Sequence, residues 1–180
     1  KEYRRQRQMC IRDRANPNFG RLREPMLRLV QWGRTFGIGS SKDTWKIDNP
    51  SDPSRSLGQS PLRSPSVFNF FRPGYVPPAT AIASNKMVAP EFQLVNETSV
   101  GGYLNFMQDK LLNGFDGKDV TASYAAEKAL SADPAALVRR LNLLLAGNQL
   151  SAGTVALITD ALSKAPLVNP GTDAARLNLI

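Results

Sequence analysis

One stretch decides how the centre of this chain folds: Ser64-Pro-Ser-Val-Phe-Asn-Phe-Phe-Arg-Pro-Gly-Tyr-Val-Pro-Pro78. Its fifteen residues hold four aromatic side chains, four prolines and one arginine. Each proline fixes φ and removes a backbone donor, so such a segment is a stiff, packed loop. We expect one short helical turn over residues 65–71, with Val67, Phe68 and Phe71 facing inward and Phe68 and Phe71 mostly buried.

Helical periodicity dominates on both sides of this loop. Apolar residues at helical spacing predict a helix over about residues 22–36, with Pro25 in its first turn and one buried face formed by Leu22, Met26, Leu29, Val30 and Phe36. A second helix is predicted from Pro90 to about Leu112. Its Gly101-Gly102 pair weakens it by about 1 kcal/mol per glycine relative to alanine, unless close packing requires them.

The last third of the sequence is also expected to be helical. The predicted elements are an Ala-rich segment over 124–130, a helix over 135–146 after the cap Asp133, a helix over 152–164 after the cap Ser151, and a last helix after Thr172. By contrast, residues 37–62 are rich in Gly, Ser, Asp, Asn and Pro and show little periodicity. They predict a long surface loop.

No stretch of the sequence alternates at a period of two residues, which is the pattern of a half-buried strand. The predicted fold is therefore all-α, with about five or six helices, one long surface loop over about 37–62 and one rigid loop rich in proline and aromatic residues over 64–78. No significant sheet is expected.

Composition limits the possible functions. The net charge is +8, but residues 1–14 hold six basic and two acidic residues and so supply +4 of it. The remaining basic residues are dispersed, which argues against nucleic acid as a partner. The sequence has no histidine and a single cysteine, Cys10, so it offers neither a Ser-His-Asp triad nor an intrachain disulfide. We expect no metal, no cofactor and no transmembrane segment in this sequence.

The N-terminal residues 1–14 stand apart from the rest. Met9-Cys-Ile-Arg-Asp-Arg14 is what the translation of a common sequencing adapter gives, so we interpret residues 1–14 as an adapter artefact or a disordered extension. The alternative is a genuine basic helix start, since Arg, Gln and Met are good helix formers. The first interpretation predicts few contacts between this segment and the rest of the chain.

Three polar residues near the aromatic loop are candidates for a site. Arg72 could bind a carboxylate, sulfate or phosphate through its guanidinium, or it could pair with Glu91 or Glu97 or cap carbonyls in the loop. Glu97 is expected in the middle of a helix among apolar neighbours, where a buried acid would need a partner or a raised pKa. Asn69 lies between two phenylalanines and is expected to be buried, with its amide organising the backbone of the loop.

Several motifs recur in the order typical of one family. They are Gly20-Arg-Leu-Arg-Glu-Pro-Met-Leu-Arg-Leu29, Leu57-Gly-Gln59 leading into Ser64–Pro73, Ala89-Pro-Glu-Phe-Gln93 and Asn96-Glu-Thr98. Together they resemble the bacterial domain-of-unknown-function 1800 family. The resemblance covers only the C-terminal portion of that family, so residues 15–180 are interpreted as a truncated helical part of a larger domain.

The resemblance implies an exported bacterial protein, periplasmic or secreted, whose relatives are encoded beside a sulfatase-like companion. The resemblance itself assigns no function, since the family is one of unknown function. We consider first a non-catalytic structural or interaction region, with the missing remainder of its own chain and the companion as candidate partners. The alternative is part of an enzyme active site, possibly hydrolase-like, in which Asn69, Arg72 and Glu97 line a site completed by the missing N-terminal half.

Overall fold

The computed structural model describes residues 22–164 and divides them into two compact units. The first unit consists of residues 22–24 and 64–96, and the second of residues 25–63 and 97–164. The predictions for residues 1–14 and for a helix after Thr172 lie outside the described residues. Each unit is described by itself.

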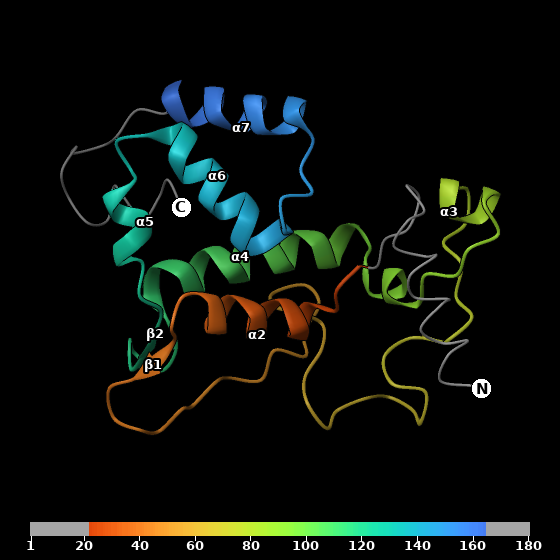
Figure 1. Ribbon diagram of the computed structural model, residues 1–180. Helices are drawn as coiled ribbons and strands as arrows, with labels where there is room; N and C mark the ends of the chain where they lie inside the picture. Colours follow the sequence, from red (N-terminus) through yellow and green to blue (C-terminus); the bar gives the residue numbers. More distant parts are fainter. Residues whose placement is uncertain (1–21, 165–180) are drawn as a thin grey trace, which may run out of the picture. The chain divides into compact units, whose positions relative to one another are not determined.

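The described residues are mostly helical, which confirms the predicted all-α fold (Figure 1). The second unit contains α2 (Pro25–Thr35), α4 (Glu97–Asn113), α5 (Ala125–Ala129), α6 (Pro134–Ala146), α7 (Ala152–Lys164) and the two-residue strands β1 (Gly39–Ser40) and β2 (Val120–Thr121). The first unit contains α3 (Ala81–Ser84) and the 3-10 helix η1 (Pro90–Leu94). Within residues 22–164, no helix has both the length and the apolar character needed to cross a membrane.

The core of the second unit is built mainly from aromatic side chains. Its buried apolar residues are Leu29, Trp32 and Phe36 from α2, Leu57 from the long loop, Phe106 from α4, and Phe115, Val120 and Tyr124. The rings meet in tilted pairs, with centroids 5.1 Å apart for Phe36 and Tyr124 and 6.1 Å apart for Phe106 and Phe115. Tilted ring pairs add stability beyond the area that they bury.

The helix α2 begins at Pro25, later than the predicted start near residue 22, and Pro25 lies in its first turn as expected because proline tolerates the first helical position. Its buried face differs from the predicted one. Trp32 is buried and its indole Nε1–H donates to the Tyr124 hydroxyl at 2.9 Å. Val30, which was expected on the apolar face, is 44% exposed.

The predicted helix from Pro90 to about Leu112 is wrong in one respect, because the structure breaks it in two. The 3-10 helix η1 ends at Val95, whose φ of −108° and ψ of 108° are extended. A β-branched residue favours this conformation, and Asn96 after it is a residue type that favours the position before a helix. The helix α4 then begins at Glu97, so the break falls where one unit ends and the other begins.

The two helices near the C-terminal end of the described chain follow the predicted capping pattern. The Asp133 carboxylate accepts from the backbone N–H of Ala136 at 2.9 Å, and α6 ends at Gly147 in the left-handed region, with φ of 59°. The Ser151 hydroxyl accepts from the backbone N–H of Thr154 at 3.1 Å, at the start of α7. The helix α6 packs against α7 and against α2.

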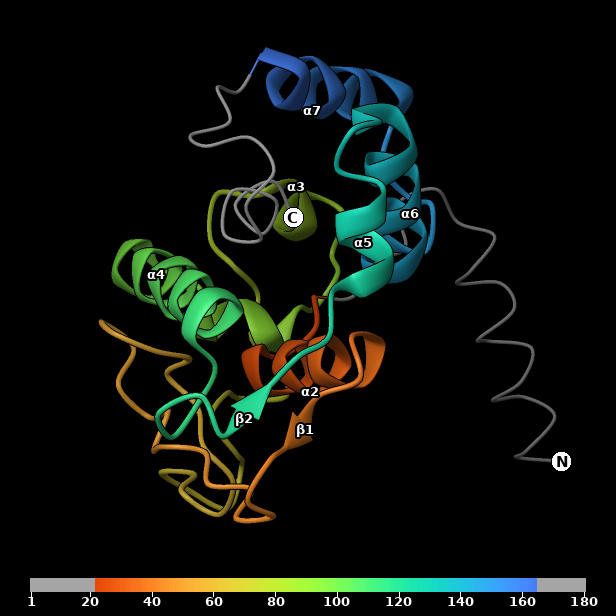
Figure 2. The same ribbon diagram turned by 90° about the vertical axis from the view of Figure 1, so that its left-hand side faces the viewer.

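The long segment 37–62 contains no helix, but it is not only a surface loop. Its start forms β1, which pairs antiparallel with β2 so that Gly39 faces Thr121 (Figure 2). Further on, Leu57 and Gln59 are buried. The Gln59 side-chain oxygen accepts from the backbone N–H of Met26 at 3.1 Å, which satisfies a donor in the first turn of α2.

Candidate functional site

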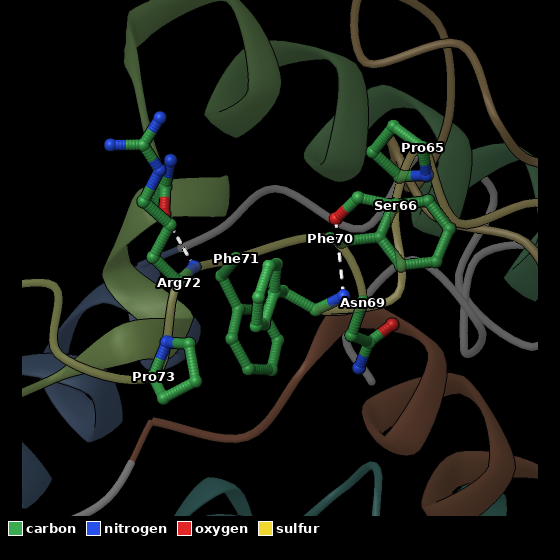
Figure 3. A pocket seen from close by; sticks show the side chains of 9 residues that line it. Pro65, Ser66, Asn69, Phe70, Phe71, Arg72 and Pro73 are labelled. Atoms are coloured by element: carbon green, nitrogen blue, oxygen red, sulfur yellow. Dashed lines mark hydrogen bonds between the residues drawn. The ribbon is translucent and has the colours of Figure 1, made fainter.

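The first unit carries an open pocket of about 590 Å³ on the aromatic loop, residues 64–78 (Figure 3). The residues that line it are Pro65, Ser66, Phe68, Asn69, Phe70, Phe71, Arg72, Pro73 and Gln93. All but Gln93 belong to the aromatic loop, and Gln93 comes from η1. One continuous segment therefore forms most of this aromatic pocket.

A tight turn shapes the loop, in place of the predicted helical turn over 65–71. The backbone N–H of Asn69 donates to the Ser66 carbonyl oxygen at 3.2 Å, and Asn69 has a φ of 69°. Asparagine tolerates this left-handed conformation better than most residues, and a helix cannot continue through it. The Ser66 hydroxyl also accepts from the backbone N–H of Phe68 at 3.1 Å (Figure 3).

This turn exposes side chains that were expected to be inside. Phe68 is 62% exposed and Val67 is 95% exposed, so the prediction of inward-facing side chains is wrong for both. Phe71 is half-buried, and Asn69, also expected to be buried, is exposed. The physical reason is the reversal at Asn69, which leaves residues 67–69 at the tip of the turn.

Arg72 is fixed through its backbone and leaves its side chain available. Its backbone N–H donates to the Gln93 side-chain oxygen at 2.8 Å, a bond that joins the loop to η1 (Figure 3). The guanidinium is exposed and forms no ion pair with any residue of the described range. The expected pairing with Glu91 or Glu97 is therefore not observed.

Glu97 does not have the position in its helix that the sequence predicts. Glu97 is exposed at the first position of α4, not in the middle of a helix, so its charge lies where the helix dipole favours an acid. It belongs to the second unit, whereas Asn69 and Arg72 belong to the first. Glu91, considered from the sequence as a partner for Arg72, is 3% exposed in η1.

The aromatic pocket offers groups for binding rather than for proton transfer. Three phenyl rings supply apolar surface, Arg72 supplies a cation, and Asn69 and Gln93 supply amides. No carboxylate, thiol or amine is among its lining residues in the described part of the chain. Within residues 22–164, no group of three or more Cys, Asp or Glu side chains is placed to hold a metal ion.

Comparison with protein families gives one result. The family model described as protein of unknown function (DUF1800) matches residues 6–180. The chain belongs to the DUF1800 family. No curated protein and no solved structure matches this DUF1800 chain.

No local pattern in the sequence singles out Asp119, a buried acid in the second unit of the DUF1800 chain. Its carboxylate accepts from the hydroxyls of Ser40, Ser41 and Thr44 at 2.7, 2.8 and 2.6 Å, and from the backbone N–H of Lys42 at 2.6 Å. These bonds, with Thr44 contributing most, hold the pKa of Asp119 well below its usual range. Asp119 thereby fixes the start of the long loop beside β2.

A second buried acid of the DUF1800 chain, Glu127, supports the core beside Tyr124. Its carboxylate accepts from the Nε of Arg140 at 2.6 Å, which joins α5 to α6. Burial, opposed by the Trp32 donor and aided by the nearby Glu127 charge, raises the pKa of Tyr124 to about 12. Both acids act through partners 13 or more positions away in sequence, which local patterns do not reveal.

Proposed function

We propose that the aromatic loop of this DUF1800 chain is a non-catalytic interaction site, at which the chain binds a partner protein. The observation that carries this proposal is the exposure of Phe68 beside the unpaired guanidinium of Arg72. Leaving a phenylalanine in water forfeits roughly 1.5–3 kcal/mol of burial free energy, which binding a partner would recover. Aromatic residues and arginine are also the side chains that most often dominate protein interfaces.

The chemistry of the pocket favours a partner segment that places an apolar side chain next to a carboxylate. The apolar side chain would lie against Phe68 and Phe71, and the carboxylate would accept from the fork of Arg72. The prolines and the Arg72–Gln93 bond hold the loop in one conformation before binding. A loop that is already ordered loses less conformational entropy on association.

We also propose that the protein is an exported bacterial protein, periplasmic or secreted, and that its partner is a sulfatase-like companion. Both proposals rest on the resemblance to the family. Fractionation of cells that express the native gene, followed by immunoblotting, tests the location. Recovery of the protein only with cytoplasmic markers would contradict it.

The alternative of an enzyme site built from Asn69, Arg72 and Glu97 has little to support it. Asn69 and Arg72 share the aromatic pocket, whose described lining residues include no carboxylate, thiol or amine to act as a general base, and Glu97 is an exposed first-turn acid of α4. The binding role therefore accounts for more of what is observed.

Site-specific photocrosslinking tests the interaction. A photoreactive phenylalanine analogue replaces Phe68 in the native protein, and a matched protein carries it at Val88, which is also exposed in the first unit but does not line the pocket. We expect a discrete crosslinked partner from position 68 and not from position 88, lost when Arg72→Ala is added. If position 68 gives no specific crosslink in the native host, the proposed interaction is refuted. If a specific crosslinked product forms but does not contain the companion, only the proposed identity of the partner is refuted.

A further inference from the structure

The second unit contains a charged group that lacks a normal partner. Arg28, on α2, lays its guanidinium over the ring of Tyr103 from α4, with Cζ 4.1 Å from the ring centroid. Its Nε is buried and has no hydrogen-bond partner. No ion pair connects Arg28 with another of residues 22–164. A buried donor of this kind is rare, because losing hydration without a partner costs free energy.

This arginine lines a cavity of about 230 Å³ among α2, α4 and α6. The wall contributed by α4 and α6 is apolar and includes Met107, Leu111 and Leu141. At about 30 Å³ per water molecule, the volume equals that of roughly eight waters. It therefore suits a small organic molecule rather than a polypeptide segment.

Two other polar groups in the wall already have partners within the fold. The Trp32 indole donates to Tyr124 at 2.9 Å, and the Gln31 amide donates to the Leu144 carbonyl at 3.3 Å. No carboxylate is among the described residues that line the cavity. Within residues 22–164, Arg28 thus supplies the cavity's single charge, and stacking on Tyr103 compensates the lost hydration only in part.

We propose that this cavity, the Arg28 pocket, binds a small organic carboxylate with an apolar aryl or alkyl body. The carboxylate accepts from the Arg28 guanidinium, including the orphaned Nε, in a charge-assisted pair. The apolar body lies against Met107, Leu111 and Leu141. This site lies in the second unit and is independent of the proposed function of the aromatic loop.

Titration of the full chain with phenylacetate and hexanoate, followed by NMR chemical shifts and calorimetry, tests this proposal. The neutral control is phenylacetamide, which keeps the body and removes the charge. We expect saturable binding of at least one acid, and binding of the amide at least about tenfold weaker, the usual scale of a charge-assisted bond. The absence of saturable binding by both acids up to millimolar concentrations, or equal binding of acid and amide, would refute the proposal.

A pair of arginine variants locates the site. Arg28→Met keeps the apolar stem and should weaken acid binding about tenfold or more. Arg34→Met removes the same charge from an exposed position of α2 outside this cavity, and should leave binding unchanged. If both variants bind like the wild type, or if only Arg34→Met loses binding, the assignment is wrong.

A third variant keeps the test decisive if Arg28→Met does not fold, which circular dichroism would show. Leu145→Trp places a bulky ring at the half-exposed rim of the cavity and leaves Arg28 in place. We expect it to block binding of phenylacetate while the far-ultraviolet spectrum stays that of the wild type. A folded Leu145→Trp variant that binds phenylacetate with wild-type affinity would contradict the proposal.

Discussion

Gly101 and Gly102 are neighbours in α4 with opposite surroundings. A Cβ at Gly101 would meet no other atom within 4 Å, whereas one at Gly102 would overlap the backbone of the long loop at Pro53 and lie 2.7 Å from the carbonyl carbon of Ser54. Close packing therefore explains the second glycine, and the contact comes from a loop rather than from another helix.

We expect the two alanine variants to differ in sign. Gly101→Ala should raise the free energy of unfolding by about 1 kcal/mol, the usual helix-propensity difference. Gly102→Ala should lower it by about 1–3 kcal/mol, because the loop must move away from the added methyl group. Urea unfolding monitored by circular dichroism measures both. Equal stabilisation by the two changes would show that the loop does not pack on α4.

Phe68 gives a second test at the level of a single residue. Its deep burial was expected from sequence, which would have made Phe68→Ala cost about 3–5 kcal/mol. Because the side chain is 62% exposed, we now expect a change within about 0.5 kcal/mol, as for other surface positions. A loss of several kcal/mol in urea unfolding would mean that the ring is buried in solution and would remove the basis for the interaction site.

At the scale of elements, Asp119 connects the start of the long loop to the strand pair. Four donors from residues 40–44 converge on its carboxylate. Its pKa is lowered in the folded state, so it contributes stability that is present above the unfolded pKa of about 3.9 and is lost as pH falls below it.

The hydrogen bonds to the Asp119 carboxylate predict that the free energy of unfolding depends on pH differently in the wild type and in Asp119→Asn. From about pH 5 down to pH 2, the wild-type free energy of unfolding should fall more steeply than that of Asp119→Asn, which has no carboxylate to protonate. Asp48→Asn, which removes an exposed carboxylate of the same loop, should follow the wild type. Urea midpoints at several pH values measure the slopes. Parallel curves for wild type and Asp119→Asn would contradict the assigned role.

Elements defined by local signals were predictable from the sequence, and those defined by distant contacts were not. The place of Pro25 in the first turn of α2, the Asp133 cap of α6 and the Ser151 cap of α7 all depend on residues within one turn. The break at Val95 and Asn96 was missed because η1 and α4 each carry a helical pattern. The bonds to Asp119 span 75 to 79 positions, beyond the reach of any local pattern.

The candidate site was predicted only in part, for a related reason. Residue types and proline content correctly drew attention to the aromatic loop, where Asn69 and Arg72 line the pocket. The direction of each side chain depends on the left-handed backbone at Asn69, with φ of 69°. Periodicity does not report such a single-residue reversal, so Phe68 was assigned to the interior.

At the scale of the whole molecule, the described buried apolar residues are concentrated in the second unit. All of the residues with large buried apolar side chains, from Leu29 to Val138, belong to it. Leu57 is notable among them because it comes from the long loop and is only 2% exposed. Through Leu57, the loop is therefore part of the core of the second unit. Its packing should contribute to the free energy of unfolding of that entire unit.

We expect Leu57→Ala to lower the free energy of unfolding by about 2–5 kcal/mol, the range for a large buried aliphatic side chain. Leu62→Ala, at a fully exposed position of the same segment, should change it by less than about 0.5 kcal/mol. Tryptophan fluorescence in a Trp45→Phe background reports on the buried Trp32, since Trp45 is 51% exposed. A single transition shifted to lower urea by Leu57→Ala alone would show that the loop and the helices unfold together. Equal midpoints for the two alanine variants would mean that the loop is separate from the core.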